Sequence, residues 1–189
     1  MYFNEDLILD IRLHELYDKV DKFIIVESCY THSGSKKNFN FKIENYKKFS
    51  DKIEYIQIDH NPQKLLKISD IDTEEIKMFK EIENALTIEN YQRNFISRGL
   101  KDINDEDIIM ISDLDEIPNL DRVDFKLYKN KIFLFKQYFF HYKFDLYLKD
   151  FFFFGTKACS KKNFITLRAD GYVPYRFELD LKESSFNSY

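Results

Sequence analysis

Residues 23–28 read Phe-Ile-Ile-Val-Glu-Ser, and this stretch decides the fold class of the chain. Its first four residues are apolar, and three of them are β-branched. Such a run is typical of a strand buried on both faces, which is how strands of parallel sheets usually lie. The polar segment 31–38, THSGSKKN, follows and is expected to be a loop.

Helical and strand-like patterns alternate on both sides of this strand. Leucines at helical spacing predict a helix near the N-terminus, over about 4–20. A second strand is expected at 53–58, a helical segment at about 72–100, and a third apolar run at 108–111. This alternation predicts an α/β fold with a single mixed sheet flanked by helices.

The composition bounds the classes of protein to which the chain can belong. It has 189 residues, 44% hydrophobic and 33% charged, which fits one domain covering residues 1–189. The net charge of −4, without a basic stripe, argues against a nucleic-acid partner. Cys29 and Cys159 are expected to be free thiols. The sequence shows no signal peptide and no run of about 20 apolar residues that could span a membrane, so a cytoplasmic protein is expected.

Three Asp-x-Asp pairs occur, and their contexts differ. Asp70 and Asp72 precede a helix that Asp72 is expected to cap in a capping box with Glu75. A second pair, at positions 105 and 107, lies in a polar loop. The pair at positions 113 and 115 is the one that directly follows an apolar strand. That pair is therefore the candidate metal site.

Two carboxylates at the end of a strand have a specific chemistry. In open α/β sheets, ligands bind outside the carboxyl ends of the strands. Asp113 and Asp115 at that edge could ligate Mg²⁺ or Mn²⁺, which take oxygen ligands and leave positions for substrate phosphates. The metal would act as a Lewis acid on a departing diphosphate. The competing interpretation is a loop in which Asp113 caps a turn and Asp115 is solvated.

A second enzyme class also uses an apolar strand that ends in Asp-x-Asp. In haloacid-dehalogenase-like phosphatases the first Asp attacks phosphorus and the second acts as acid and base. That motif usually lies near the N-terminus, whereas here it begins at residue 113 and Glu-Ile-Pro follows. The phosphatase is therefore the alternative function.

Several separate stretches carry a family resemblance. They are DIRLHELYD at 10–18, VDKFIIVES at 20–28, YQRN at 91–94 with Gly99-Leu100, DIIMISDLDEIP at 107–118, and FGTK at 154–157 with Leu167-Arg168. Together they resemble glycosyltransferase family 17, the family of the bisecting β-1,4-N-acetylglucosaminyltransferases. The stretches 10–28 and 107–118 are specific in combination, and the resemblance covers most of the chain.

The resemblance implies a GT-A type fold and metal-dependent, inverting transfer of a sugar to a glycan hydroxyl. The implied donor is a nucleotide-diphospho-sugar, with a UDP-sugar favoured and N-acetylglucosamine as the sugar in the animal enzymes. Glu27 and Ser28 would lie near the donor's nucleoside, and Arg93 with Asn94 would help to hold the nucleotide beside Asp113.

Two departures from the family limit what carries over. The chain has no Trp, whereas the family pattern continues into a segment that contains Trp and His. Either the chain lacks the C-terminal part of the family domain or that region has diverged. The membrane anchor of the animal enzymes is also not found, which favours a bacterial or viral protein with another acceptor. A catalytically inactive nucleotide-sugar-binding domain is the third functional alternative.

The catalytic base is not identified by the sequence. Inverting transfer needs a carboxylate or His to accept the acceptor hydroxyl's proton. Glu116, His141 and Asp145 are the weak candidates, and Glu116 is expected to point away from Asp115 because neighbours on an extended chain alternate. Lys36 and Lys37, the lysines of the expected loop at 31–38, are expected to be solvated. Most aromatic residues of 139–147 are expected to be core rather than a sugar-stacking platform.

Overall fold

The computed structural model describes residues 1–128, 131–143, 145–164 and 186–188. They form two compact units, one of residues 1–10 and 20–102, the other of residues 11–19 and 103–189. The boundary therefore falls inside the first helix. The expectation of one domain over 1–189 stays a prediction. Leu167-Arg168 of the family resemblance lies outside the described residues.

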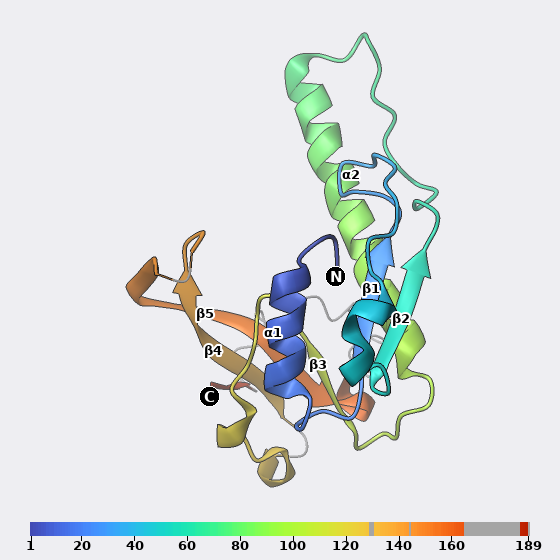
Figure 1. Ribbon diagram of the computed structural model, residues 1–189. Coiled ribbons are helices and arrows are strands. Elements are labelled where there is room, and N and C mark those ends of the chain that lie inside the picture. Colours follow the sequence, from blue (N-terminus) through green and yellow to red (C-terminus); the bar gives the residue numbers. More distant parts are fainter. Residues whose placement is uncertain (129–130, 144, 165–185, 189) are drawn as a thin grey trace. The chain divides into compact units, whose positions relative to one another are not determined.

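The first unit is built on a pair of parallel strands. β1 and β2 pair in register from Phe23↔Ile53 to Ser28↔Ile58, so the predicted buried parallel strand and its partner are both confirmed. Helix α2 contacts β1, and the 3₁₀ helix η2 contacts both strands (Figure 1). In chain order the elements are α1 (Asp6–Leu16), β1 (Phe23–Ser28), η1 (Ile43–Phe49), β2 (Ile53–Ile58), α2 (Glu74–Asn94) and η2 (Phe95–Leu100).

The core of the first unit joins these strands to the end of the long helical segment. Val26, Ile58 and Phe95 are buried together with Ile56. Gly99 allows η2 to approach β1 closely, because a Cβ at this position would lie 2.8 Å from the side chain of Ile24. The apolar β-branched residues that predicted buried strands are therefore the residues that hold the helical segment to the sheet.

The N-terminus of α2 corrects the predicted capping box. The N-cap is Thr73, whose hydroxyl accepts a hydrogen bond from the Ile76 amide at 3.4 Å. Asp72 instead accepts from the Ser69 amide and pairs with Lys80 at 2.6 Å. Both Asp and Thr are good N-cap residues, so sequence alone does not decide between neighbouring positions.

The second unit contains a four-stranded sheet in the order β3-β5-β4-β6. β3 and β4 each pair antiparallel with β5, and β4 pairs parallel with β6. Its core centres on Phe133, Phe135 and Ala158. In chain order the elements are β3 (Ile108–Ile111), η3 (Leu120–Arg122), η4 (Phe125–Tyr128), β4 (Ile132–Phe140), β5 (Tyr147–Ser160) and β6 (Phe186–Ser188).

The prediction of a single mixed sheet is wrong, because the strands of the described residues form two separately hydrogen-bonded sheets. β3 is also antiparallel to its neighbour rather than part of a parallel sheet, and most of its residues are only half-buried. An apolar run indicates burial but not the partner strand. The partner is decided by distant residues, here 157–160 of β5.

The prediction that most aromatic residues of 139–147 are core is wrong as well. Phe140 and Tyr147 are 44% and 42% exposed, and Tyr142 is 92% exposed, whereas Phe139 is half-buried. These residues belong to the far part of the β4–β5 ribbon, visible in Figure 1. β3 pairs only with residues 157–160 and β6 only with 132–134, so neither strand extends along that part.

Within the described parts of the chain, no helix has the length and apolar character needed to cross a membrane. Cys29 and Cys159 are free thiols, as predicted, and both are buried.

Candidate functional site

The predicted site residues are divided between the two units. The first unit contains Glu27, Ser28, Arg93 and Asn94. The second unit contains Asp113, Asp115, Glu116, His141 and Asp145.

The Asp-x-Asp pair lies in a tight turn directly after β3. The Glu116 amide donates to the Asp113 carbonyl at 3.2 Å, and the Glu116 carboxylate accepts from the Asp113 amide at 2.9 Å. Glu116 is 7% exposed, whereas Asp115 is exposed and Asp113 is half-buried. Glu116 is therefore buried where Asp115 is exposed, and the Glu116 side chain closes the turn.

Arg12 holds this turn from the side of helix α1. Its Nη1 donates to the carbonyl oxygens of Glu116 at 2.8 Å, Asp113 at 3.3 Å and Leu114 at 3.4 Å. Its Nη2 donates to the Ser112 hydroxyl at 2.5 Å. One guanidinium group therefore contacts residues along the whole length of the turn.

The charge of Arg12 is balanced by the acidic turn. Burial lowers the pKa of Arg12 to about 10, while the carboxylates of Glu116, Asp115 and Asp113 raise it. The group is therefore still charged at neutral pH. The role of Arg12 was not predicted from the sequence, where the residue stands only within the 10–18 stretch of the family resemblance.

Strand β5 supports the turn from another direction. The hydroxyl of Thr156, which is fully buried, donates to the Glu116 carbonyl at 3.0 Å. The neighbouring Gly155 leaves room for the Glu116 side chain, because a Cβ at this position would lie 2.8 Å from Glu116 Cδ and closer still to Gln137 Oε1. The FGTK motif thus serves as the support of the Asp-x-Asp turn.

His141 and Asp145 are not brought to this turn. They are exposed residues at the hairpin connection between β4 and β5, where the His141 amide donates to the Leu146 carbonyl at 2.9 Å. Thr156, which contacts the turn, lies nine positions further along β5 than Tyr147 at the hairpin end. That separation corresponds to roughly 30 Å along a strand. A base must come within hydrogen-bond reach of the proton it accepts.

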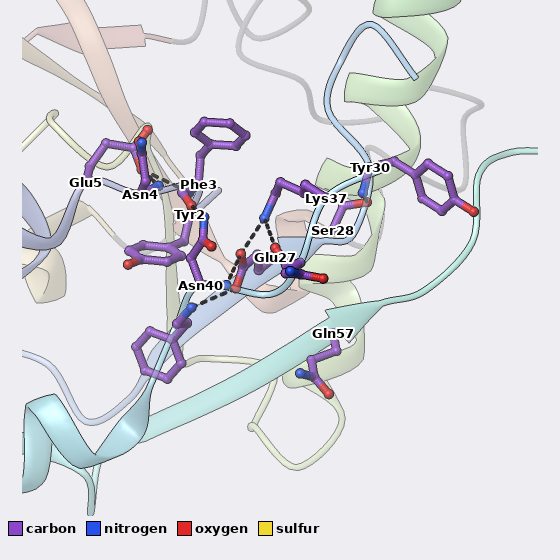
Figure 2. A network of polar contacts seen from close by, with 12 residues as sticks. Tyr2, Phe3, Asn4, Glu5, Glu27, Ser28, Tyr30, Lys37, Asn40 and Gln57 are labelled. Carbon is purple, nitrogen blue, oxygen red and sulfur yellow. Dashed lines mark hydrogen bonds and ion pairs between the residues drawn. The ribbon is translucent and has the colours of Figure 1, made fainter. Parts of the chain in front are cut away.

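In the first unit, the Glu27 carboxylate is the centre of a polar network at the end of β1 (Figure 2). It pairs with Lys37, and it accepts from the Asn40 amide at 2.8 Å, the Phe41 amide at 3.0 Å and the Tyr55 hydroxyl at 2.7 Å. Its side chain has no exposed surface. Through these contacts the Glu27 carboxylate holds the segment 37–41 in place. The position of Glu27 near a donor nucleoside stays a prediction.

The expectation that both lysines of the loop after β1 are solvated is wrong for Lys37. Lys36 is exposed as expected, but Lys37 is 13% exposed at its side chain and pairs with Glu27. Ser28 is buried, and its hydroxyl accepts from the Tyr30 amide at 3.0 Å. A buried carboxylate needs a compensating cation, and Lys37 supplies it.

Arg93 and Asn94 lie at the end of α2. Arg93 pairs with Glu89 one helical turn earlier, at 2.8 Å from Nη2 and 2.9 Å from Nε. The Asn94 carbonyl accepts from the Ser97 hydroxyl at 2.7 Å, where the helix changes to 3₁₀ geometry. Arg93 thus forms an ion pair with Glu89 along the face of α2. The role of Arg93 and Asn94 in holding a nucleotide stays a prediction.

A second polar network of the first unit joins the N-terminus to η1. The hydroxyls of Tyr2 and Tyr46 donate to the same oxygen of Asp6, at 2.5 and 2.8 Å. Burial and the hydrogen bond to Asp6 raise the pKa of both tyrosines, and the two hydrogen bonds lower the pKa of Asp6. Burial and the hydrogen bond to Glu27 raise the pKa of Tyr55 in the same way.

The chemistry of the Asp113–Glu116 turn fits a hard divalent cation. In the part of the chain that the structure describes, no group of three or more His, Cys, Asp or Glu side chains could hold a metal ion. Mg²⁺ is often bound by only one or two carboxylates, with waters and substrate phosphates as the other ligands. Asp113 and Asp115 are the residues that would supply the two carboxylates.

Comparison with known families and proteins decides the family. A model of glycosyltransferase family 17 matches residues 1–169, which include the first unit and most of the second. The chain belongs to glycosyltransferase family 17. No solved structure matches it. The family match favours glycosyl transfer over the phosphatase alternative.

Curated relatives of this family 17 chain are mammalian enzymes. It is 30% identical over 130 residues to the beta-1,4-mannosyl-glycoprotein 4-beta-N-acetylglucosaminyltransferases of Homo sapiens and Rattus norvegicus. The Mus musculus enzyme of that name is similar to the same extent. Each alignment covers 64% of this chain and 21% of the relative, so the chain spans about a fifth of the length of these proteins.

Replacing the buried Glu27 tests the polar network of the family 17 chain. We expect Glu27→Gln to lower the free energy of unfolding by about 3–5 kcal/mol, because it leaves Lys37 without its partner in a buried place. Glu54→Gln, which removes the exposed pair with Lys22, is the matched control and should cost about 1 kcal/mol or less. Urea unfolding measures both, and equal effects would contradict the assigned role.

Because Tyr2, Tyr46 and Tyr55 are hydrogen-bonded to carboxylates, we expect the stability of the fold to fall at alkaline pH. Their folded pKa values lie above the ordinary value near 10, so their contribution to stability is complete below about pH 10 and is lost above it. Above about pH 10, each of these tyrosines should lower the free energy of unfolding by up to about 1.4 kcal/mol per pH unit. Urea unfolding at several alkaline pH values measures the slope, which should be shallower in Tyr55→Phe. Tyr142→Phe, at a 92% exposed position, is the control and should leave the slope unchanged.

Adding a methyl group at position 155 tests the support of the turn. Gly155→Ala should lower the free energy of unfolding by about 1–3 kcal/mol, because the side chains of Gln137 and Glu116 must both move. In a double-mutant cycle with Glu116→Ala, part of the cost of Gly155→Ala should disappear, since one of the two clashing side chains is gone while Gln137 remains. Additive effects of the two substitutions would show that the close approach is unimportant.

Proposed function

We propose that this chain is the nucleotide-sugar-binding part of a metal-dependent, inverting glycosyltransferase with a GT-A type fold. The observation that carries the proposal is the Asp113–Glu116 turn of a family 17 chain. Its backbone groups are bound by Arg12, Glu116 and Thr156, while the carboxylate of Asp115 is exposed to solvent. A pre-organised acidic turn of this kind suits the binding of a cation together with a diphosphate.

The proposed donor is a UDP-sugar, and the proposed sugar is N-acetylglucosamine. The support for the sugar is the name of the mammalian relatives, which are N-acetylglucosaminyltransferases that act on a mannosyl-glycoprotein. A glycan hydroxyl is the proposed acceptor class. Because the chain spans about a fifth of those relatives, their acceptor is not carried over.

In the proposed mechanism, Asp113 and Asp115 would hold Mn²⁺ or Mg²⁺ against the donor's diphosphate. When bound, the cation supplies Lewis-acid stabilisation of the negative charge on the leaving diphosphate. The two carboxylates fix the position of that charge, and the contacts of the turn keep them in place before the donor arrives. Such pre-organisation avoids a reorganisation cost during the reaction.

The structure supports none of the three candidate bases, Glu116, His141 and Asp145. The Glu116 carboxylate already accepts the Asp113 amide, which suits a positioning residue. His141 and Asp145 lie at the far end of the β4–β5 ribbon. The base is therefore left unassigned, and a domain that binds the donor without turnover is the second candidate function.

Nucleotide titration tests the proposal. We expect UDP to bind with a dissociation constant that is at least about tenfold lower with Mn²⁺ than without it. Asp113→Asn/Asp115→Asn should abolish this difference, because amides bind the cation more weakly than carboxylates. Calorimetric titration of UDP, GDP and UDP-N-acetylglucosamine measures the affinities and the preferred base.

A matched control removes two other aspartates. Asp70→Asn/Asp105→Asn changes one exposed residue from each of the other two Asp-x-Asp pairs, and it should bind UDP and Mn²⁺ as the wild type does. Binding without hydrolysis or transfer of UDP-N-acetylglucosamine would support the inactive binding domain. If no nucleotide binds under any condition, the proposed function is refuted and the family likeness reflects ancestry alone.

A further inference from the structure

Most backbone polar groups of the Asp113–Glu116 turn form hydrogen bonds. The Asp113 and Glu116 amides are used within the turn itself. The carbonyl oxygens of Asp113, Leu114 and Glu116 accept from Arg12, and that of Glu116 also accepts from Thr156. Arg12 therefore binds three carbonyl groups that would otherwise depend on water or on a bound cation.

We infer that Arg12 is the positioning residue of the metal-binding turn, which fixes the backbone so that Asp113 and Asp115 keep the spacing that a divalent cation needs. This inference rests on the proposed function, because it concerns the same site. Arg12 itself would touch neither the metal nor the donor. Its effect would pass through the backbone of the turn.

The shape of the guanidinium group explains why an arginine is needed here. Its two terminal nitrogens donate to acceptors on either side, Nη2 to the Ser112 hydroxyl and Nη1 to carbonyls as far along as Glu116. Arginine presents five donors in a rigid planar fork, whereas lysine presents one compact ammonium group. A lysine would keep the charge at position 12, but it could not reach both ends of the turn at once.

The charge of Arg12 cannot be the reason for its place beside a metal site. A fixed positive charge repels a divalent cation, so charge alone would weaken metal binding. The same charge does neutralise part of the acidic turn when no cation is bound. The benefit to metal affinity must therefore come from geometry, and this sets the sign of the effect expected in variants.

The test compares Arg12→Lys and Arg12→Gln in the full chain, with Mn²⁺ alone as the probe. We expect both substitutions to raise the Mn²⁺ dissociation constant about 10- to 100-fold, the usual effect of removing a partner that orients metal ligands. Hydrogen exchange of the Asp113 amide in metal-free protein should be faster in both variants. Calorimetric titration and mass spectrometry of exchanged peptides measure the two effects.

Two control variants separate positioning from other effects. Arg122→Gln removes an exposed arginine of the same unit and should change the Mn²⁺ dissociation constant by less than about twofold, because exposed charges are screened. Phe133→Leu destabilises the core of the unit without changing Arg12 or a residue of the turn, and it should keep its Mn²⁺ affinity at a temperature where it is folded.

The outcomes distinguish this inference from the proposed function. If the wild type binds no Mn²⁺, with or without UDP, the proposed function fails and the inference falls with it. If the wild type binds Mn²⁺ and either Arg12 variant binds it as tightly or more tightly, only the inference is overturned. An equal loss in Phe133→Leu would also overturn it, since general loosening of the unit would then be the cause.

Discussion

The structure of the second unit depends on one half-buried guanidinium group. Arg12 has four acceptors, three of them carbonyl oxygens of the turn that carries the Asp-x-Asp pair. Burying a cation is costly unless its donors are satisfied, so the turn and the arginine stabilise each other. The family motif around Arg12 and the Asp-x-Asp motif are about a hundred residues apart in sequence, and this contact explains why one needs the other.

In the first unit the buried charge that is compensated by hydrogen bonds is negative rather than positive. The Glu27 carboxylate follows a buried strand, and it is compensated by one lysine, two backbone amides and a tyrosine hydroxyl. Both units thus place an ion at the end of an apolar strand and use it to fix an irregular segment. Charge-assisted hydrogen bonds of this kind are stronger than neutral ones, and they hold a loop in one conformation.

Local features of the fold could be predicted from sequence, but long-range features could not. The runs at 23–28 and 53–58 become buried parallel strands, as their β-branched residues indicate. The division into two sheets and the antiparallel partner of 108–111 depend on residues far away, which periodicity does not describe. In the site, the Asp-x-Asp turn was found because it follows a strand. Arg12 was missed because a half-buried arginine is recognised only once its partners are known.

The aromatic end of the β4–β5 ribbon has a practical consequence for handling the protein. Tyr138, Phe151 and Phe152 are 42–66% exposed on strands whose neighbours β3 and β6 cover only their other end. Exposed strand edges with apolar side chains can pair with other chains, and lysines on the same strands oppose such pairing. Lys136 and Lys149 interrupt this ribbon. Colloidal stability in concentrated solution will therefore depend on keeping those ammonium groups charged and the ionic strength low.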